Sequence, residues 1–361
     1  MASKKLMMTI LWIVFVFLQS CANGKPQVPC LFVFGDSLSD DGNNNNLVTL
    51  AKCNYRPYGI DFPKGPTGRF SNGRNMIDFL AQLLGFEDYI PPFATARGKE
   101  ILKGVNYASG AAGIRNETSG QNQGDRISMD RQLKNHETTM SEINRMLGNN
   151  HNTTVEYLSK CIYSVAIGSN DYLSNYFLPQ YYPTSRLYTQ QQYAVVLIDQ
   201  LSQQLTTLYQ YGARKLAVFG LSEIGSIPLE RSLCGNGTKG SACVDNINNA
   251  AQLFNDRLKS LLSQLNNKLT NATFIFINAT EIGATSPSLA SMVADVPCCK
   301  VSNITGLCKP FGNTCSNRSQ YIYWDAIHPT EAMDALFAGR AYKAQSPNDA
   351  SPFDISHLAQ L

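Results

Sequence analysis

The sequence has few of the residues that mark several large functional classes. Only 16% of its 361 residues are charged, and the formal net charge of +3 is too small to favour nucleic-acid binding. It contains only four histidines and two tryptophans. Beyond residue 24, no apolar run reaches the ~20 residues that a bilayer-spanning helix needs. The chain is therefore expected to be globular and long enough to bury a sizeable core.

Residues 1–24 differ from the rest of the chain. Two lysines precede an apolar run at 6–18, and small residues follow that run. A charged start, a short apolar core and small residues at the exit are typical of a secretory signal peptide. A membrane anchor is the alternative, but the run is too short to span a bilayer. We expect cleavage after Ala22 or Gly24 and secretion of the mature protein to the extracellular space, with the cell wall as one destination.

Asparagine sequons also favour export. Seven Asn-x-Ser/Thr sequences occur, which is many for a chain of this length. In an exported protein they predict surface glycans at several positions. The candidate asparagines are Asn116, Asn152, Asn236, Asn271, Asn278, Asn303 and Asn317.

Of the ten cysteines, Cys21 leaves with the signal peptide and nine remain. Cys234 and Cys243 lie in Gly- and Asn-rich segments, as does a cluster at positions 298, 299, 308 and 315. In an oxidising compartment these residues are expected to form disulfides. A zinc site is disfavoured, because the spacings fit no zinc motif and no histidine lies among them. Nine cysteines cannot all pair, and Cys161, which opens an apolar run, is predicted to be a free buried thiol.

Short apolar runs alternate with amphipathic stretches along the mature chain. The runs predict strands, each ending at a glycine or a polar turn: 28–34, 104–108, 161–167, 215–219 and 273–277. The amphipathic stretches predict helices: 75–84, 127–146, 190–211, 246–269 and 330–344. This alternation is typical of a parallel sheet covered by helices on both faces. Such doubly wound sheets bind ligands outside the carboxyl ends of their strands.

Three of the predicted strand ends carry residues suited to nucleophilic chemistry. Ser37 follows the first strand, Gly110 the second and Asn170 the third, and all three ends reach the same edge of the sheet. A serine is a poor nucleophile unless a base takes its proton. Near the C-terminus, Asp325 and His328 are close enough to meet in one turn, where the carboxylate would fix the tautomer and orientation of the imidazole.

This set of residues predicts a serine-dependent acyl hydrolase. His328 takes the proton of Ser37, so activity is expected to fall at acid pH as the imidazole is protonated. The backbone N–H groups of Ser37 and Gly110 and the side-chain amide of Asn170 are the expected donors to the oxyanion. Taken singly, each residue also has a structural interpretation, such as a turn serine or a packing glycine. The other histidines lie in polar contexts and are interpreted as solvated: His136, His151 and His357.

Four sequence blocks resemble those of the GDSL (SGNH) esterase/lipase family. The blocks are Gly35-Asp36-Ser37-Leu38, Gly110, Gly168-Ser169-Asn170-Asp171 and Asp325-Ala326-Ile327-His328-Pro329. The plant-type secreted members are the most similar, through Phe34–Asp40, Gly68–Arg74 and Asn106–Gly110, and the resemblance runs from about residue 28 to 344. It implies an α/β fold, a three-layer α/β/α sandwich with a doubly wound, five-stranded parallel sheet of flavodoxin-like order. Residues 25–361 would form one hydrolase domain.

The resemblance also implies roles for the residues of the site. Ser37 would be the nucleophile, His328 the base and Asp325 its partner, with Gly110 and Asn170 completing the oxyanion hole. No metal or organic cofactor is implied. One departure is Ala111, which stands where many plant-type members have a second glycine, and its methyl group is expected to narrow the oxyanion loop slightly. A Gly-x-Ser-x-Gly motif does not occur, which argues against the α/β-hydrolase fold.

The expected function is that of a secreted carboxylesterase or lipase that cleaves lipid or small-molecule acyl esters through an acyl-enzyme. The resemblance implies lipid degradation as its broad role. An acyltransferase using the same acyl-enzyme and a catalytically silent binding glycoprotein are the alternatives. A metal hydrolase is disfavoured, because Asp36, Asp40 and Asp41 are expected to bond the turn or cap a helix rather than hold a cation. The natural ester, its acyl length and the oligomeric state stay open.

Overall fold

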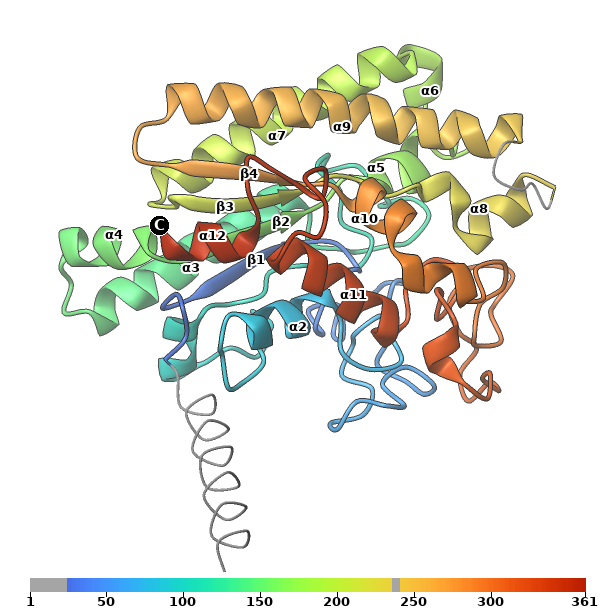
Figure 1. The fold of residues 1–361 in the computed structure, drawn as a ribbon, viewed down its shortest axis with the longest axis horizontal. Helices are drawn as coiled ribbons and strands as arrows, with labels where there is room; N and C mark the ends of the chain where they lie inside the picture. The colour runs from blue at the N-terminus through green and yellow to red at the C-terminus, as the bar shows by residue number, and fades with distance from the viewer. Residues whose placement is uncertain (1–24, 236–240) are drawn as a thin grey trace, which may run out of the picture.

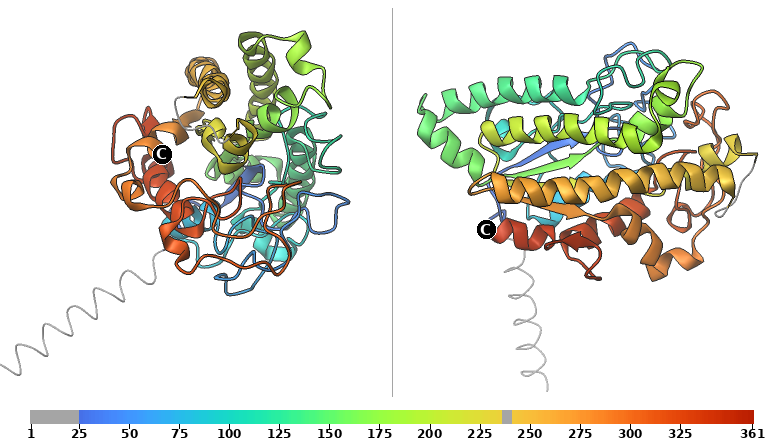
Figure 2. Two further views of the ribbon diagram at one scale, coloured as in Figure 1. Left: turned by 90° about the vertical axis from the view of Figure 1, so that its right-hand side faces the viewer. Right: turned by 90° about the horizontal axis from the view of Figure 1, so that it is seen from above.

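The computed structural model describes residues 25–235 and 241–361, so the expected signal peptide lies outside the described residues. A five-stranded sheet forms the middle layer of a sandwich, with helices on both faces (Figures 1 and 2). The strands, in their order across the sheet, are β1 (Leu31–Gly35), β2 (Ile162–Ala166), β3 (Lys215–Phe219), β4 (Thr273–Ile277) and β5 (Ala350–Ser351).

The helices fall into two layers that can be assigned from the residues packed between them. One layer consists of α3 (Met129–Met146), α4 (His151–Ser159), α7 (Gln190–Gln210) and α9 (Ala242–Lys268). The other consists of α2 (Met76–Leu83), α11 (Glu331–Tyr342) and α12 (Ile355–Gln360). Shorter helices lie near the carboxyl ends of the strands: α5 (Ser169–Asp171), α6 (Thr184–Leu187), α8 (Pro228–Leu233) and α10 (Ala279–Thr285).

The strands are apolar at nearly every position because both of their faces are buried. In β1, Phe32 and Phe34 pack against the α3, α7 and α9 layer. Leu31 and Val33, which point the other way, pack against the α2 and α11 layer. This arrangement is characteristic of a parallel sheet with helices on both sides, and it confirms the fold class expected from the sequence.

The sheet differs from the prediction at its two edges. The predicted strand at 104–108 is irregular, but it runs parallel to β1, with the Val33 N–H bonded to the Val105 carbonyl at 3.1 Å and the Tyr107 N–H to the Val33 carbonyl at 2.8 Å. Counted with the four parallel strands, this segment gives the flavodoxin-like order. At the other edge, the short strand β5 pairs antiparallel with β4 and was not predicted.

Four disulfides join cysteines of the described chain. The pairs Cys234–Cys243, Cys298–Cys315 and Cys299–Cys308 confirm the disulfides expected from the sequence. The prediction of a free Cys161 is wrong, because Cys161 is bonded to Cys30. Each of these two residues directly precedes a strand, and the register that pairs Leu31 with Ile162 brings their Cα atoms to 4.8 Å. The free cysteine of the described residues is the buried Cys53.

Replacing both Cys30 and Cys161 by alanine is expected to lower the free energy of unfolding by about 2–5 kcal/mol, because the bond constrains a long loop in the unfolded chain. That loop spans a sequence separation of 131 residues. Urea unfolding followed by tryptophan fluorescence measures the loss. Cys53→Ala is the matched control, since it removes a buried thiol without removing a cross-link. Equal stability of the double variant and the wild type would contradict the expectation.

Candidate active site

Asp325 and His328 lie in a tight turn whose backbone holds the two side chains together. Asp325 Oδ1 accepts hydrogen bonds from the backbone N–H groups of Ile327 at 2.8 Å and His328 at 2.7 Å. The Trp324 N–H closes the turn by donating to the His328 carbonyl at 2.8 Å. As a result, His328 Nδ1 lies 2.8 Å from Asp325 Oδ2 and 3.0 Å from Oδ1.

Ser37 lies in the turn that follows β1, where its hydroxyl faces the other side of the same imidazole. Its Oγ is 2.8 Å from His328 Nε2. The turn is shaped by Asp36, whose side chain accepts a hydrogen bond from the Leu38 N–H at 3.1 Å. Asp325 is fully buried and His328 is 2% exposed, whereas Ser37 is partly accessible. The structure therefore brings the three residues into one hydrogen-bonded line with its open end at the serine.

Two aromatic side chains next to this line were not singled out from the sequence. The ring of Phe70 packs against the imidazole of His328, with 4.7 Å between ring centroids. The hydroxyl of Tyr58 donates a hydrogen bond to Asp325 Oδ2 at 2.6 Å. Both residues lie in the long Pro- and Gly-rich segment at 55–73. Its length was one sign of a functional role, and its end belongs to the block Gly68–Arg74 that carries the family resemblance.

Gly110, an expected oxyanion donor, has its backbone N–H bonded within the protein. Its N–H donates to Asp40 Oδ2 at 2.8 Å, so the group expected to face the substrate is already bound to a buried carboxylate. The structure instead indicates a packing role. A Cβ at Gly110 would lie 2.6 Å from Phe70 Cζ, so only glycine lets Phe70 reach its place beside His328. Ala111 follows with a φ of 65°, a conformation that an L-residue seldom adopts.

Asn170 lies beyond the carboxyl end of β2, as the sequence predicted. It belongs to α5, immediately after β2, and it lines the same cavity as Ser37 and His328. One N–H of its side-chain amide donates to the Ala112 carbonyl at 3.0 Å. Because an amide NH₂ has two donors, the second N–H can serve a ligand while the first fixes the orientation of the group.

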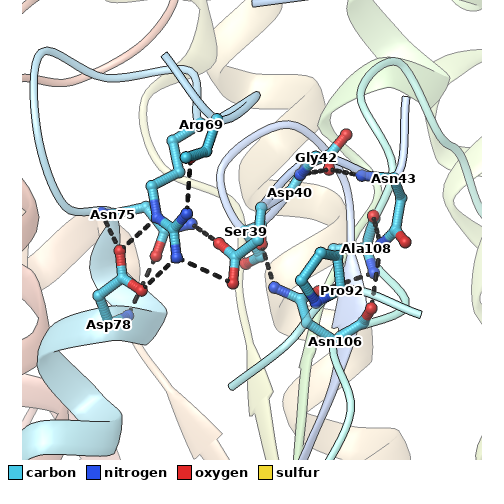
Figure 3. Close-up of polar contacts among 12 residues, drawn as sticks. Ser39, Asp40, Gly42, Asn43, Arg69, Asn75, Asp78, Pro92, Asn106 and Ala108 are labelled. Carbon is cyan, nitrogen blue, oxygen red and sulfur yellow. Dashed lines mark hydrogen bonds and ion pairs between the residues drawn. The ribbon is translucent and has the colours of Figure 1, made fainter. Parts of the chain in front are cut away.

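A buried ion pair fixes the loop after β1 to helix α2 (Figure 3). The guanidinium of Arg69 donates to both carboxylate oxygens of Asp78, at 2.6 and 2.7 Å, and lies 3.3 Å from Asp41. Asn75, the N-cap of α2, donates to Asp41 at 2.7 Å. Bidentate pairing of this kind favours one geometry, so it holds the loop that carries Ser37 in place.

A second set of contacts fixes the same loop to the segment beside β1. Figure 3 shows Asn43 reaching Asn106 and Ala108, whose carbonyls accept from its side-chain amide at 2.9 and 2.7 Å. In return, Asn106 Nδ2 donates to the Ser39 carbonyl at 2.6 Å. Asp40 and Asp41, the carboxylates that follow Ser37, thus bind donors of the protein itself. In residues 25–235 and 241–361, no group of three or more side chains is placed to hold a metal ion.

A cavity of about 590 Å³ opens beside Ser37, at the carboxyl ends of the strands. Its size is that of a small-molecule site. Its walls are mainly aliphatic and aromatic, with residues from several segments: Ile167, Leu173, Phe219, Leu221, Ile224, Ile227, Ile322, Ile327, Met333 and Phe337. The charged lining residues include Asp36, Asp334, and Arg231, which pairs with Asp295 at 2.6 Å. The cavity can therefore accept an apolar group attached to a polar one.

Burial raises the pKa of the carboxyl groups beneath the site. The pKa of Asp36 is about 7, because desolvation outweighs the Leu38 N–H bond and the attraction of His328. Desolvation likewise raises the pKa of Asp40 to about 6, and that of Asp41 to about 7 despite the nearby Arg69. These groups bind protons near neutral pH only because the folded chain removes them from water.

The interpretation of His136 as a solvated residue is wrong. His136 is completely buried on the inner face of α3, between the rings of Phe32, Phe34 and Tyr163. Its Nδ1 lies 3.0 Å from the hydroxyl of Tyr107. Burial lowers its pKa to about 3, so the ring is neutral and is part of the core.

Comparison with known proteins gives a family match over most of the chain. The family model described as GDSL-like Lipase/Acylhydrolase matches residues 31–341. The chain is 51% identical to GDSL esterase/lipase At1g29670 of Arabidopsis thaliana over 346 residues, which cover 94% of each chain. It is 47% identical to GDSL esterase/lipase At1g29660 of the same plant over 364 residues, or 99% of each chain. Both turns that carry Ser37 and His328 lie within the matched region.

The buried carboxyls are expected to make the protein less stable as pH rises from 6 to 8. Their folded pKa values exceed the usual 3.8, so their stabilising contribution is complete at low pH and is lost as pH rises through 7. His136 opposes this change only in the lower part of that range, because its own contribution is reduced below about pH 6.5, and the two carboxyls together outweigh this one imidazole. Thermal unfolding should give a Tm lower by roughly 2 °C or more at pH 8.

Asp36→Asn should weaken this pH dependence, because the amide keeps the bond to Leu38 but does not titrate. Asp199→Asn, a change at an exposed carboxyl on α7, is the matched control and should leave the dependence as in the wild type. A Tm that is flat or rises between pH 6 and 8 in the wild type would contradict the burial argument.

Proposed function

The chain belongs to the GDSL-like lipase/acylhydrolase family and is a hydrolase of carboxylic esters, and on that premise we propose that Ser37, His328 and Asp325 are its catalytic triad. The observation that carries this proposal is the line of hydrogen bonds from Ser37 Oγ to His328 Nε2 and from His328 Nδ1 to Asp325, each at 2.8 Å. A serine needs a base within hydrogen-bond reach, and the base needs an orienting acceptor on its other nitrogen.

In the proposed reaction, His328 takes the proton of Ser37 as Oγ attacks the carbonyl carbon of the ester. The tetrahedral intermediate then collapses, and the alcohol leaves with the proton that His328 returns. The acyl group is now bonded to Ser37. His328 next takes a proton from a water molecule as its oxygen attacks the acyl carbon. When the second tetrahedral intermediate collapses, His328 returns that proton to Ser37 Oγ, and the carboxylic acid leaves. Throughout, Asp325 holds the imidazole and stabilises its charged form.

The developing oxyanion requires donors aimed at it, and we assign this role to the Ser37 N–H and the Asn170 side-chain amide. Both belong to residues that line the cavity beside the nucleophile. Gly110 is left out of the assignment, because its N–H is bound to Asp40. Its contribution is to let Phe70 pack beside His328.

The substrate we propose is an ester with an apolar acyl group, such as an acyl lipid. The aliphatic walls of the cavity at Ser37 support this choice, because burying an acyl chain there removes apolar surface from water on both partners. The cavity is built by strand ends and helices drawn from most of the chain, which supports residues 25–361 acting as one hydrolase domain.

We further propose that the protein is exported, with its signal peptide in residues 1–24 and glycans on its sequons. The four disulfides support an oxidising compartment. Six sequon asparagines lie in the described residues and are accessible at least in part: Asn116, Asn152, Asn271, Asn278, Asn303 and Asn317. Asn236 lies outside the described residues. Among residues 25–235 and 241–361, no helix is long and apolar enough to cross a membrane.

Ser37→Ala is expected to abolish hydrolysis of a p-nitrophenyl acyl ester while leaving the fold intact, because the variant lacks the nucleophile. Ser39→Ala is a matched control two residues away. The Ser39 hydroxyl is buried without a hydrogen-bond partner among the described contacts, so its loss should leave most activity. Asn170→Ala should lower kcat by roughly 10²–10³ with little change in KM. Wild-type activity in the Ser37 variant would refute the triad.

Expression of the full chain in a plant secretory system tests export. The mature protein recovered from the medium should begin at Asn23 or Lys25, as N-terminal sequencing would report. Treatment with an N-glycosidase should lower its apparent mass. A product retained inside the cell with its first residues intact would count against export, whatever its esterase activity.

A further inference from the structure

Tyr58 is a buried residue that the reaction steps above do not use. It lies in the loop between β1 and α2 and is fully buried. Its ring packs edge-on against Tyr55 and Phe70, at centroid distances of 5.4 and 6.4 Å. Its hydroxyl lies 2.6 Å from Asp325 Oδ2, although 267 positions separate the two residues in the sequence.

The contacts of Tyr58 determine where its proton points. The backbone N–H of Cys308 lies 2.9 Å from the Tyr58 oxygen, and an N–H can only donate. The hydroxyl therefore accepts from Cys308 and has its single proton free for Asp325. Burial and the negative charge of Asp325 raise the pKa of Tyr58 well above its usual value, so this proton stays in place at neutral pH.

The position of Cys308 is itself fixed by several contacts. Cys308 is bonded to Cys299, and its carbonyl accepts a hydrogen bond from the hydroxyl of Tyr55 at 2.9 Å. Cys299 in turn donates its N–H to the Trp324 carbonyl at 2.9 Å, next to Asp325. The cysteine-rich segment at 298–315 thus bonds both to Trp324, next to Asp325, and to Tyr58. These contacts keep the Tyr58 hydroxyl at a constant distance from the Asp325 carboxylate.

Tyr58 acts on the oxygen of Asp325 that lies nearest to the imidazole. Oδ1 is occupied by two backbone N–H groups, from Ile327 and His328. Oδ2 is shared between the Tyr58 hydroxyl at 2.6 Å and His328 Nδ1 at 2.8 Å. A donor on Oδ2 withdraws negative charge from the atom that stabilises the protonated imidazole, and it also prevents the carboxylate from rotating.

We propose that Tyr58 is a positioning residue that holds Asp325 in place and limits how strongly Asp325 stabilises the protonated form of His328. This inference rests on the proposed triad. Without the hydroxyl, Asp325 Oδ2 has one donor fewer and attracts the imidazolium more strongly. His328 then stays protonated to higher pH and is unavailable as a base over a wider range.

Tyr58→Phe tests the inference because it keeps the ring and removes only the hydroxyl. We expect kcat for a p-nitrophenyl ester to fall roughly 10-fold, the order of loss expected when one hydrogen bond to a charged group is removed. KM should stay nearly constant, because Tyr58 does not line the cavity. The acid limb of the pH profile of kcat/KM should move to higher pH. Active-site labelling with a fluorophosphonate normalises the rates to the amount of correctly folded enzyme.

Tyr55→Phe is the matched control. Tyr55 belongs to the same aromatic cluster and bonds the same cysteine, but its hydroxyl reaches the Cys308 carbonyl and has no bond to Asp325. This variant should keep the wild-type pH profile. If both variants shift the profile equally, packing of the cysteine-rich segment explains the effect and the inference is overturned.

A double variant shows whether Tyr58 acts through Asp325 or only supports the fold in general. In an Asp325→Asn background, Tyr58→Phe should cause no further slowing of Ser37 labelling, because the acceptor on which Tyr58 acts is already changed. Additive losses would overturn the inference, as would an unshifted pH profile in the single variant. Activity that survives Ser37→Ala would instead refute the triad itself, so the two failures are distinguishable.

Wild-type protein offers a measurement for the case in which Tyr58→Phe does not fold. The buried hydroxyl proton between Tyr58 and Asp325 is protected from solvent and should give a slowly exchanging, downfield proton resonance, as expected for a short bond to a carboxylate. Its chemical shift should change when the imidazole is protonated, through the shared Oδ2. A resonance that does not respond to protonation would overturn the inference.

Discussion

Asp325 is a charged group with no access to water, and the rest of the site is built around the donors that it requires. A buried carboxylate is stable only when its oxygens are hydrogen-bonded. The Asp325 turn supplies two backbone N–H groups at 2.7 and 2.8 Å, and the remaining oxygen takes the imidazole and Tyr58. The same four bonds fix the orientation of His328. The hydrogen bonds that the buried Asp325 carboxylate requires therefore also orient the imidazole toward Ser37.

On the Ser37 side of the site, the loop after β1 is likewise held by hydrogen bonds and ion pairs to buried carboxylates. Arg69 pairs with Asp78 and Asp41, and Asp40 binds three backbone N–H groups, including that of Gly110. These bonds give the loop after β1 a single conformation without regular secondary structure. The raised pKa values of Asp36, Asp40 and Asp41 are a consequence, because a loop that is fixed by buried acids must keep them away from water.

The sequence predicted the parts of this arrangement that depend on neighbouring residues. The strand–glycine–serine turn at Ser37 and the spacing of Asp325 and His328 are local patterns, and the structure brings these residues together. Partners distant in the sequence were not predictable. Neither the Gly110 bond to Asp40 nor the position of Cys30 beside Cys161 follows from spacing alone. The burial of His136 was predictable, since it shares a helix face with Leu133 and Ile143.

The two halves of the site come from opposite ends of the chain, and this has a consequence for biosynthesis. A ribosome completes the Ser37 turn early, but it adds Asp325 and His328 only near the end of translation. Nascent or truncated chains consequently have the proposed nucleophile without its base. Under the proposed mechanism and the proposed export, such chains would be unable to attack the lipids of the membranes that they cross. Late completion of the site would thus protect the producing cell from premature activity of its own product.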